Sequence, residues 1–102
     1  MFAATVIREF LSRHAVTVVP GIAAARQARV AGSFDAVLVD YDLDDGKGDE
    51  FVRELRADDE GVVIVGVSSH DEGNAALRRA GASAICSKME FDEIENVLRG
   101  LT

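Results

Sequence analysis

The stretch Asp35-Ala-Val-Leu-Val-Asp-Tyr-Asp-Leu-Asp-Asp-Gly-Lys-Gly48 decides the fold. It begins with a short apolar run, partly β-branched, and this pattern predicts a strand over 36–40 that is buried on both faces. The carboxylates that follow are those of Asp40, Asp42, Asp44 and Asp45. Ligand sites in open α/β sheets lie at the carboxyl ends of strands, so these acids are candidates for a metal or phosphoryl site. A polar strand exit is the alternative, since Asp is common in turns.

The composition indicates one small domain that covers residues 1–102. The net charge of −7 disfavours nonspecific binding to nucleic acids or to anionic membranes, which requires a basic face. No apolar run is long enough for a transmembrane helix, and the first residues lack the features of a signal peptide. The single cysteine, Cys86, fits a reducing compartment. We therefore expect a cytoplasmic protein.

Helical and strand patterns alternate along the chain. Helices are predicted at about 2–13, 22–30, 49–58, 72–80 and 91–100. Strands are predicted at 16–19, 36–40, 62–67 and 84–87. Residues 46–48 are expected to form a loop, and Asp49 and Asp71 are expected to cap the helices that follow them. This order predicts an α/β fold in which a parallel sheet of about four strands is covered by five helices on both faces.

Three polar side chains follow the carboxyl ends of three predicted strands: Asp40, Ser68 and Lys88. Because parallel strands share one carboxyl edge, we expect these side chains to surround a common site. Asp40 can act as a nucleophile towards phosphorus, Lys88 offers a compact cation, and Ser68 offers a hydroxyl donor. Phosphoryl transfer needs mainly positioning and charge stabilisation, so these groups suffice if a divalent metal ion joins them. Taken singly, Ser68 could be a turn residue and Lys88 a solvated charge.

The same segments resemble the receiver domain of two-component response regulators, of the chemotaxis-regulator type. Asp40 to Gly48 is similar to the segment that carries the phosphoacceptor aspartate, and Val63 to Asp71 to the strand that ends in the switch serine or threonine. Arg79-Ala-Gly-Ala82 with Ser87-Lys88 is similar to the family's alanine-glycine-alanine turn and lysine. The resemblance covers nearly the whole chain from residue 2. It implies a flavodoxin-like doubly wound parallel sheet.

The resemblance also implies a function, that of a signalling domain which is not an enzyme. Asp40 would accept phosphate from a histidine kinase or a phosphotransfer protein. Asp40 and the backbone carbonyl of Asp42 would bind Mg²⁺, Lys88 would pair with the phosphoryl group, and Ser68 would reorient towards it. We expect no output domain after Thr102, and therefore an output through a partner protein or through self-association.

Several positions depart from the family pattern. Family members open with a central strand that ends in a magnesium-binding acidic pair, whereas this chain opens on the helix that follows that strand. Mg²⁺ is therefore expected to bind weakly or not at all. Asp44 and Met89 stand where the family usually has proline, and Ile85 replaces the switch aromatic. Without that proline, a cis peptide bond after Lys88 is not expected.

The shortened start also has a structural consequence. Without the family's first strand, the strands at 16–19 and 36–40 must pair directly, or another chain must fill the gap. An unpaired apolar edge favours association, so a homodimer or a larger assembly is expected. The alternative is that the natural start lies upstream of Met1.

Other readings of the same residues remain open. A degenerate receiver would keep the fold and act as an interaction or dimerisation module without phosphorylation. A haloacid-dehalogenase-like phosphatase would use Asp40, Asp42, Ser68 and Lys88, but the chain lacks that family's later acidic pair and a cap. A calcium-binding EF-hand loop starting at Asp40 is disfavoured because the sixth position lacks glycine and the twelfth lacks glutamate.

Overall fold

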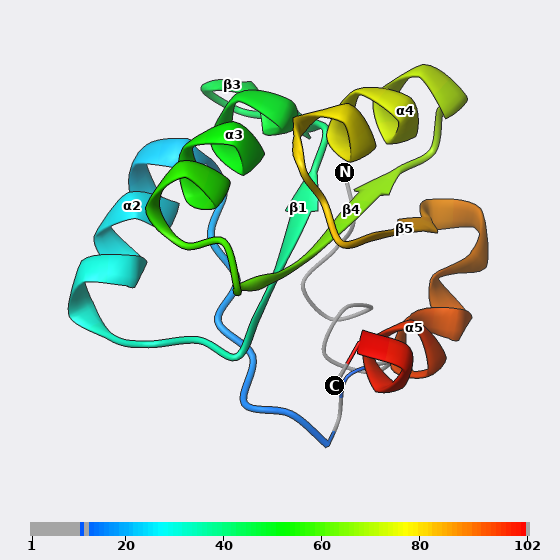
Figure 1. The fold of residues 1–102 in the computed structure, drawn as a ribbon, viewed down its shortest axis with the longest axis horizontal. Coiled ribbons are helices and arrows are strands. Elements are labelled where there is room, and N and C mark those ends of the chain that lie inside the picture. The colour runs from blue at the N-terminus through cyan, green and yellow to red at the C-terminus, as the bar shows by residue number, and fades with distance from the viewer. Residues whose placement is uncertain (1–10, 12, 102) are drawn as a thin grey trace.

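A three-stranded parallel sheet lies at the centre of the protein in a computed structural model that describes residues 11 and 13–101 (Figure 1). The strands are β1 (Ala36–Asp40), β2 (Asp42–Leu43), β3 (Gly46–Lys47), β4 (Val63–Ser68) and β5 (Ala84–Ser87). The helices are α2 (Ile22–Ala31), α3 (Gly48–Asp58), α4 (Asp71–Ala80), the 3₁₀ helix η1 (Lys88–Glu93) and α5 (Ile94–Leu101). The sheet has the order β1-β4-β5, and β2 and β3 form a separate antiparallel hairpin.

The carboxyl ends of the three parallel strands are level with one another. Asp40, the last residue of β1, pairs with Val67 of β4, and Val67 pairs with Cys86 of β5. The strands are joined through α3 and α4, as expected for parallel neighbours that need crossover connections. Any polar groups that follow these strands therefore lie at one edge of the sheet.

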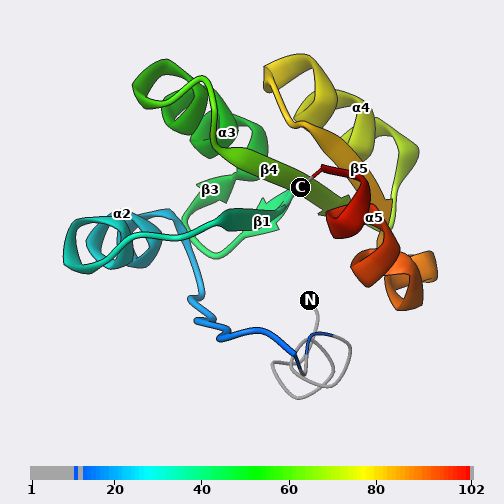
Figure 2. The ribbon, with the colours of Figure 1, turned by 60° about the horizontal axis from the view of Figure 1, so that its bottom comes forward.

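The core consists of two apolar clusters, one on each face of the sheet. Consecutive residues of β4 contribute to opposite clusters: Ile64 packs with Leu55 and Leu77 of α3 and α4, whereas Val65 packs with Ile94 of α5. Figure 2 shows α3 and α4 on one side of the sheet and α5 on the other. Both Ile64 and Val65 are completely buried, as expected for a central strand covered on both faces. The predicted α/β doubly wound architecture is confirmed.

The predicted strand at 16–19 is wrong, so the sheet of the described residues has three strands and not four. Within residues 13–101, the outer edge of β1 has no strand beside it. A cavity of about 1270 Å³ is lined by both the 16–19 segment and β1, including Val16, Val18, Val19, Val37 and Leu38. A β-branched run becomes a strand only where another backbone pairs with it, and this segment finds none. The predicted helix at 2–13 lies almost entirely outside the described residues.

Helix and loop boundaries also differ in detail from the prediction. The expected loop at 46–48 is instead β3 followed directly by the first residue of α3. Asp49 and Asp71 are not the N-caps of their helices; those positions belong to Lys47 and His70. Both aspartates lie in the first helical turn, where a carboxylate interacts favourably with the helix dipole. The predicted helix at 91–100 begins inside the 3₁₀ turn η1 and continues as α5.

The amino-terminal end of the sheet is closed by the side chain of Arg56. Its guanidinium donates to the backbone carbonyls of Glu60 and Val62 at 2.8 Å each, and to that of Gly81 at 2.8 and 3.0 Å. It also donates to the hydroxyl of Ser83 at 3.2 Å. One planar cation therefore joins the end of α3, the start of β4 and the turn before β5.

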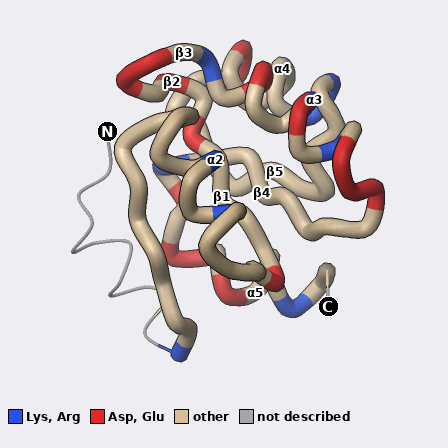
Figure 3. Tube along the Cα trace, turned by 90° about the vertical axis from the view of Figure 1, so that its left-hand side faces the viewer, with Lys and Arg blue, Asp and Glu red and all other residues tan. Residues whose placement is uncertain are grey.

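Among the described residues, no helix combines the length and the apolar character that crossing a membrane requires. Figure 3 shows acidic residues gathered at the β2–β3 hairpin, next to the carboxyl edge of the sheet.

Candidate functional site

The carboxyl edge of the sheet brings together the side chains of Asp40 and Lys88. One carboxylate oxygen of Asp40 lies 2.7 Å from the ammonium nitrogen of Lys88. Both side chains are largely buried, with 21% and 13% of their surface exposed. Asp40 is level with Cys86, and Lys88 comes two residues later, so strand alternation directs both side chains to the same face. A carboxylate with so little access to water needs a compensating charge, and Lys88 supplies it.

The backbone after Asp40 is fixed by several hydrogen bonds. The second carboxylate oxygen of Asp40 accepts a hydrogen bond from the N–H of Asp42 at 3.1 Å. The N–H of Tyr41 donates to the carbonyl of Val67 at 3.2 Å, and the N–H of Gly48 donates to the carbonyl of Tyr41 at 2.7 Å. Gly48 packs so tightly that a Cβ atom there would collide with the backbone carbonyl of Asp40. The candidate phosphoacceptor is thus held in place by both its main chain and its side chain.

Ser68 ends β4 at the same edge, but its hydroxyl points to the other face of the sheet. Its neighbour Val67 packs in the α5 cluster, so alternation directs Ser68 towards α4. The Ser68 side chain is 2% exposed, and its oxygen accepts a hydrogen bond from the N–H of His70 at 3.1 Å. It also lies against Gly73 of α4, where a Cβ atom would collide with the hydroxyl oxygen. The structure therefore joins Asp40 with Lys88 and leaves the Ser68 hydroxyl with His70.

Sequence reasoning missed a second lysine near the site. Lys47 of β3 lies across the hairpin from Asp42, and its ammonium nitrogen is 2.5 Å from an Asp42 carboxylate oxygen. The hydrogen bond from Lys47 lowers the pKa of Asp42, helped by the positive charge of Lys88. The same bond raises the pKa of Lys47. Both side chains are more than half exposed, so the pair contributes little to stability. The sequence feature that could have revealed this pair is the short separation of Asp42 and Lys47 across a tight hairpin.

The donor set at this edge does not fit a magnesium ion held by the protein alone. Within residues 13–101, no three of the His, Cys, Asp and Glu side chains come together as a metal site. The carboxylates of Asp40 and Asp42 are each paired with a lysine. Mg²⁺ usually keeps several waters and binds through one or two carboxylates together with phosphate oxygens. Here the protein would offer Asp40 and the backbone carbonyl of Asp42, the two ligands expected from the sequence.

Solved structures with the same fold are found among two-component proteins, although no protein-family model and no curated protein matches the sequence. The response regulator TrrA of Thermotoga maritima, in complex with Mg²⁺-BeF, has a TM-score of 0.85 at 19% identity, covering 96% of this chain and 88% of that one. The receiver domain of NtrX from Brucella abortus has a TM-score of 0.83 at 19% identity, covering 94% of this chain and 86% of that one.

A receiver domain attached to a kinase is similar as well. The receiver domain of the sensor histidine kinase PA1611 from Pseudomonas aeruginosa, with a magnesium ion in its active-site cleft, has a TM-score of 0.83. It is 24% identical, and the match covers 95% of this chain and 85% of that one. At such identities the likeness establishes the fold. This chain therefore has the flavodoxin-like fold of the response regulator receiver domains, as its sequence motifs predict.

Proposed function

We propose that this chain is a receiver module of two-component signalling that accepts a phosphoryl group on Asp40. The single observation that carries the proposal is the ion pair between Asp40 and Lys88 at the carboxyl edge of the sheet. It supplies a carboxylate nucleophile and, 2.7 Å away, a cation for the incoming phosphoryl oxygens. The donor would be a phosphohistidine on a histidine kinase or on a phosphotransfer protein.

The transfer itself is a substitution at phosphorus. A carboxylate oxygen of Asp40 forms a bond to phosphorus while the bond between phosphorus and the donor's imidazole nitrogen breaks, and the electron pair of that bond stays on the imidazole. The product is an acyl phosphate on Asp40. Lys88 would move from the free carboxylate to the phosphoryl oxygens, and Ser68 would turn from His70 towards the same group. Because the protein offers few ligands, Mg²⁺ would bind weakly.

The module would act in the cytoplasm through protein contacts. The net charge of −7 argues against direct binding to nucleic acids or to anionic membranes. A second copy of the chain is a candidate partner, because β1 has no strand beside its outer edge among the described residues. The apolar cavity of about 1270 Å³ next to that edge adds a surface for association. We therefore propose a homo-oligomer.

A second candidate is a degenerate receiver that acts as an interaction module without phosphorylation. The observation that favours it is the small number of metal-binding groups, since no three of the His, Cys, Asp and Glu side chains within residues 13–101 come together as a metal site. This candidate keeps the fold and the proposed self-association and loses only the chemistry of Asp40.

Intact-mass measurement after incubation with acetyl phosphate and magnesium distinguishes the candidates. We expect the wild-type protein to gain the mass of one phosphoryl group, and the Asp40→Asn variant to gain none. The matched control is Asp44→Asn, which changes a nearby exposed carboxylate and should leave the gain intact. No gain in the wild type supports the degenerate module. Continuous hydrolysis of a phosphate ester would instead support the phosphatase alternative.

A further inference from the structure

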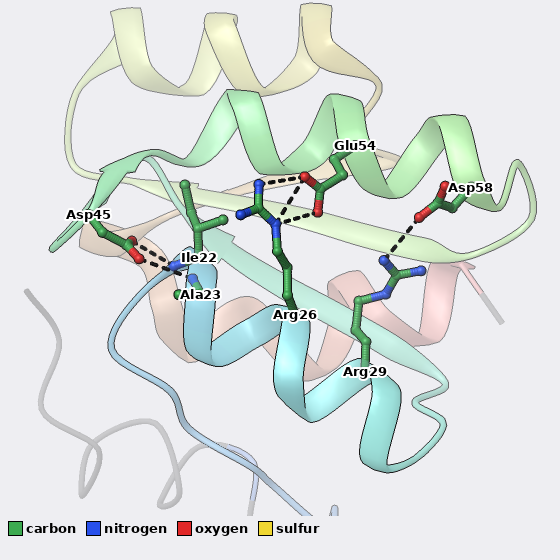
Figure 4. A network of polar contacts seen from close by, with 7 residues as sticks. All are labelled: Ile22, Ala23, Arg26, Arg29, Asp45, Glu54 and Asp58. Atoms are coloured by element: carbon green, nitrogen blue, oxygen red, sulfur yellow. Dashed lines mark hydrogen bonds and ion pairs between the residues drawn. The ribbon is translucent and has the colours of Figure 1, made fainter.

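Asp45, at the tip of the β2–β3 hairpin, caps a helix that begins far earlier in the sequence. One carboxylate oxygen accepts a hydrogen bond from the N–H of Ile22 at 2.7 Å, and the other accepts one from the N–H of Ala23 at 3.0 Å (Figure 4). These N–H groups belong to the first turn of α2, where no intrahelical acceptor is available. The hydrogen bonds from Ala23 and Ile22 lower the pKa of Asp45, so the cap carries a negative charge at neutral pH.

Helix α2 has no cap of its own. Its N-cap residue is Gly21, which has no side chain to accept a hydrogen bond, and its first turn contains no acidic residue. By contrast, α3 and α4 carry acids in their first turns: Asp49, Glu50, Asp71 and Glu72. A carboxylate at a helix N-terminus interacts favourably with the helix dipole. For α2, that carboxylate comes from the loop that follows the Asp40 site.

Close packing shows that the hairpin tip and α2 are fitted to each other. A Cβ atom on Gly21 would collide with the carboxylate of Asp45. A Cβ atom on Gly46, the next residue of the hairpin, would lie 2.9 Å from the terminal methyl group of Ile22. A side chain at Gly21 would displace the Asp45 carboxylate from the first turn of α2, and one at Gly46 would shift the end of the Ile22 side chain.

The other end of the hairpin is held by Asp40. The carboxylate of Asp40 accepts a hydrogen bond from the N–H of Asp42, the first residue of β2. The ion pair between Asp42 and Lys47 then links β2 to β3. We propose that Asp45 is a positioning residue that couples the Asp40 site to the first turn of α2. Removing the Asp40 acceptor would loosen the hairpin and weaken the cap on α2.

The response should be confined to the first turn of α2. Further along the helix, Arg26 donates to both carboxylate oxygens of Glu54 at distances of 2.6 to 3.1 Å, and Arg29 pairs with Asp58 at 3.3 Å (Figure 4). Both acids belong to α3. These pairs hold the middle and the end of α2 to its neighbour independently of Asp45.

The test is a double-mutant cycle that does not depend on phosphorylation. Amide hydrogen exchange at Ile22 and Ala23 is measured by NMR in the wild type, in Asp40→Ala, in Asp45→Ala and in the double variant. We expect Asp45→Ala to speed this exchange about fivefold, the usual effect of losing a helix cap. Asp40→Ala should speed it in the presence of Asp45 and have no further effect in its absence.

Two controls separate coupling from general destabilisation. Asp44→Ala removes the neighbouring carboxylate, whose side chain makes no hydrogen bond or ion pair with the described residues, and should leave the exchange unchanged. Arg29→Ala, which breaks the pair with Asp58 at the far end of α2, should also leave the exchange at Ile22 and Ala23 unchanged. If Asp45→Ala fails to fold, Asp45→Asn takes its place in the cycle. Additive effects of Asp40→Ala and Asp45→Ala overturn the proposal, whether or not acetyl phosphate modifies Asp40.

Discussion

The ammonium group of Lys88, which directly follows β5, lies 2.7 Å from the carboxylate of Asp40 at the end of β1, although β1 and β5 are not neighbours. Strand β4 separates β1 from β5, so the ion pair crosses the end of the central strand. The contact links the turn after β5 to the end of β1 on the face of the sheet that α5 covers.

Replacing Lys88 with methionine should destabilise the protein and slow its modification. The change leaves the largely buried carboxylate of Asp40 without its cation, and we expect the free energy of unfolding to fall by about 1 to 3 kcal/mol. Formation of an acetyl phosphate adduct should slow at least about tenfold, because the phosphoryl oxygens lose their cation. Urea unfolding and a time course of intact mass measure the two effects. The control is Lys47→Met, which breaks an exposed pair; equal destabilisation by both variants would contradict this reading.

Alanine at Gly48 should disturb the site through the backbone. The added methyl group would collide with the carbonyl oxygen of Asp40 and lie 3.0 Å from a methyl group of Val39. We expect a loss of about 1 to 3 kcal/mol in urea unfolding, together with slower adduct formation. Gly100→Ala is the matched control, because its added Cβ would meet no atom within 4 Å beyond its chain neighbours and its own helix backbone, and alanine favours the helix. Unchanged stability of Gly48→Ala would show that the backbone can yield at no cost.

The stabilisation provided by Asp45 should depend on pH in a defined direction. Hydrogen bonds from Ala23 and Ile22 lower its pKa in the folded state, so its contribution is complete above the ordinary carboxyl pKa of about 3.9. The contribution is then lost as the pH falls through the lower folded-state value. Urea unfolding of the wild type and of Asp45→Asn from pH 7 to pH 2 should therefore give a difference that disappears in acid. A difference that persists unchanged at the lowest pH would mean that the ionised cap is not its source.

Association through the open side of β1 should depend on Val18. This residue lines the large cavity and is 37% exposed. We expect light scattering to show that the apparent mass of the wild type rises with concentration, and that Val18→Lys suppresses the rise by placing a charge in the apolar cavity. Val30→Lys is the control, since Val30 is 91% exposed on α2 and does not line the cavity. A wild-type protein that stays monomeric at high concentration would refute the homo-oligomer.

Much of the fold was predictable because strong local patterns coincide with tertiary burial. The run at 62–67 and the apolar positions of α3 and α4 match elements that are buried on the expected faces. The strand predicted at 16–19 was wrong because a strand needs a partner, and β-propensity says nothing about whether one is present. The β2–β3 hairpin was not predicted for a different reason: its two-residue strands are too short for any periodicity to reveal them.

The site was predictable to the extent that topology alone determines it. Parallel strands place Asp40 and Lys88 at one edge, and the structure confirms that these two side chains meet. The position of the Ser68 hydroxyl did not follow from the shared strand edge alone. Strand alternation directs it to the opposite face of the sheet, where its oxygen accepts a hydrogen bond from the N–H of His70. Asp45 gave no local signal, since it caps a helix 22 to 23 residues away in the sequence.

Because Arg56 stabilises the end of the sheet opposite Asp40, the two ends of the sheet can be altered separately. Its guanidinium binds carbonyls of the loop before β4 and of the turn before β5, at the amino-terminal end of the sheet, whereas Asp40 and Lys88 lie at the carboxyl end. A lysine at position 56 would keep the charge and lose the planar fork that reaches several acceptors at once. An engineer could therefore adjust the melting temperature through this far end while leaving the Asp40–Lys88 pair untouched.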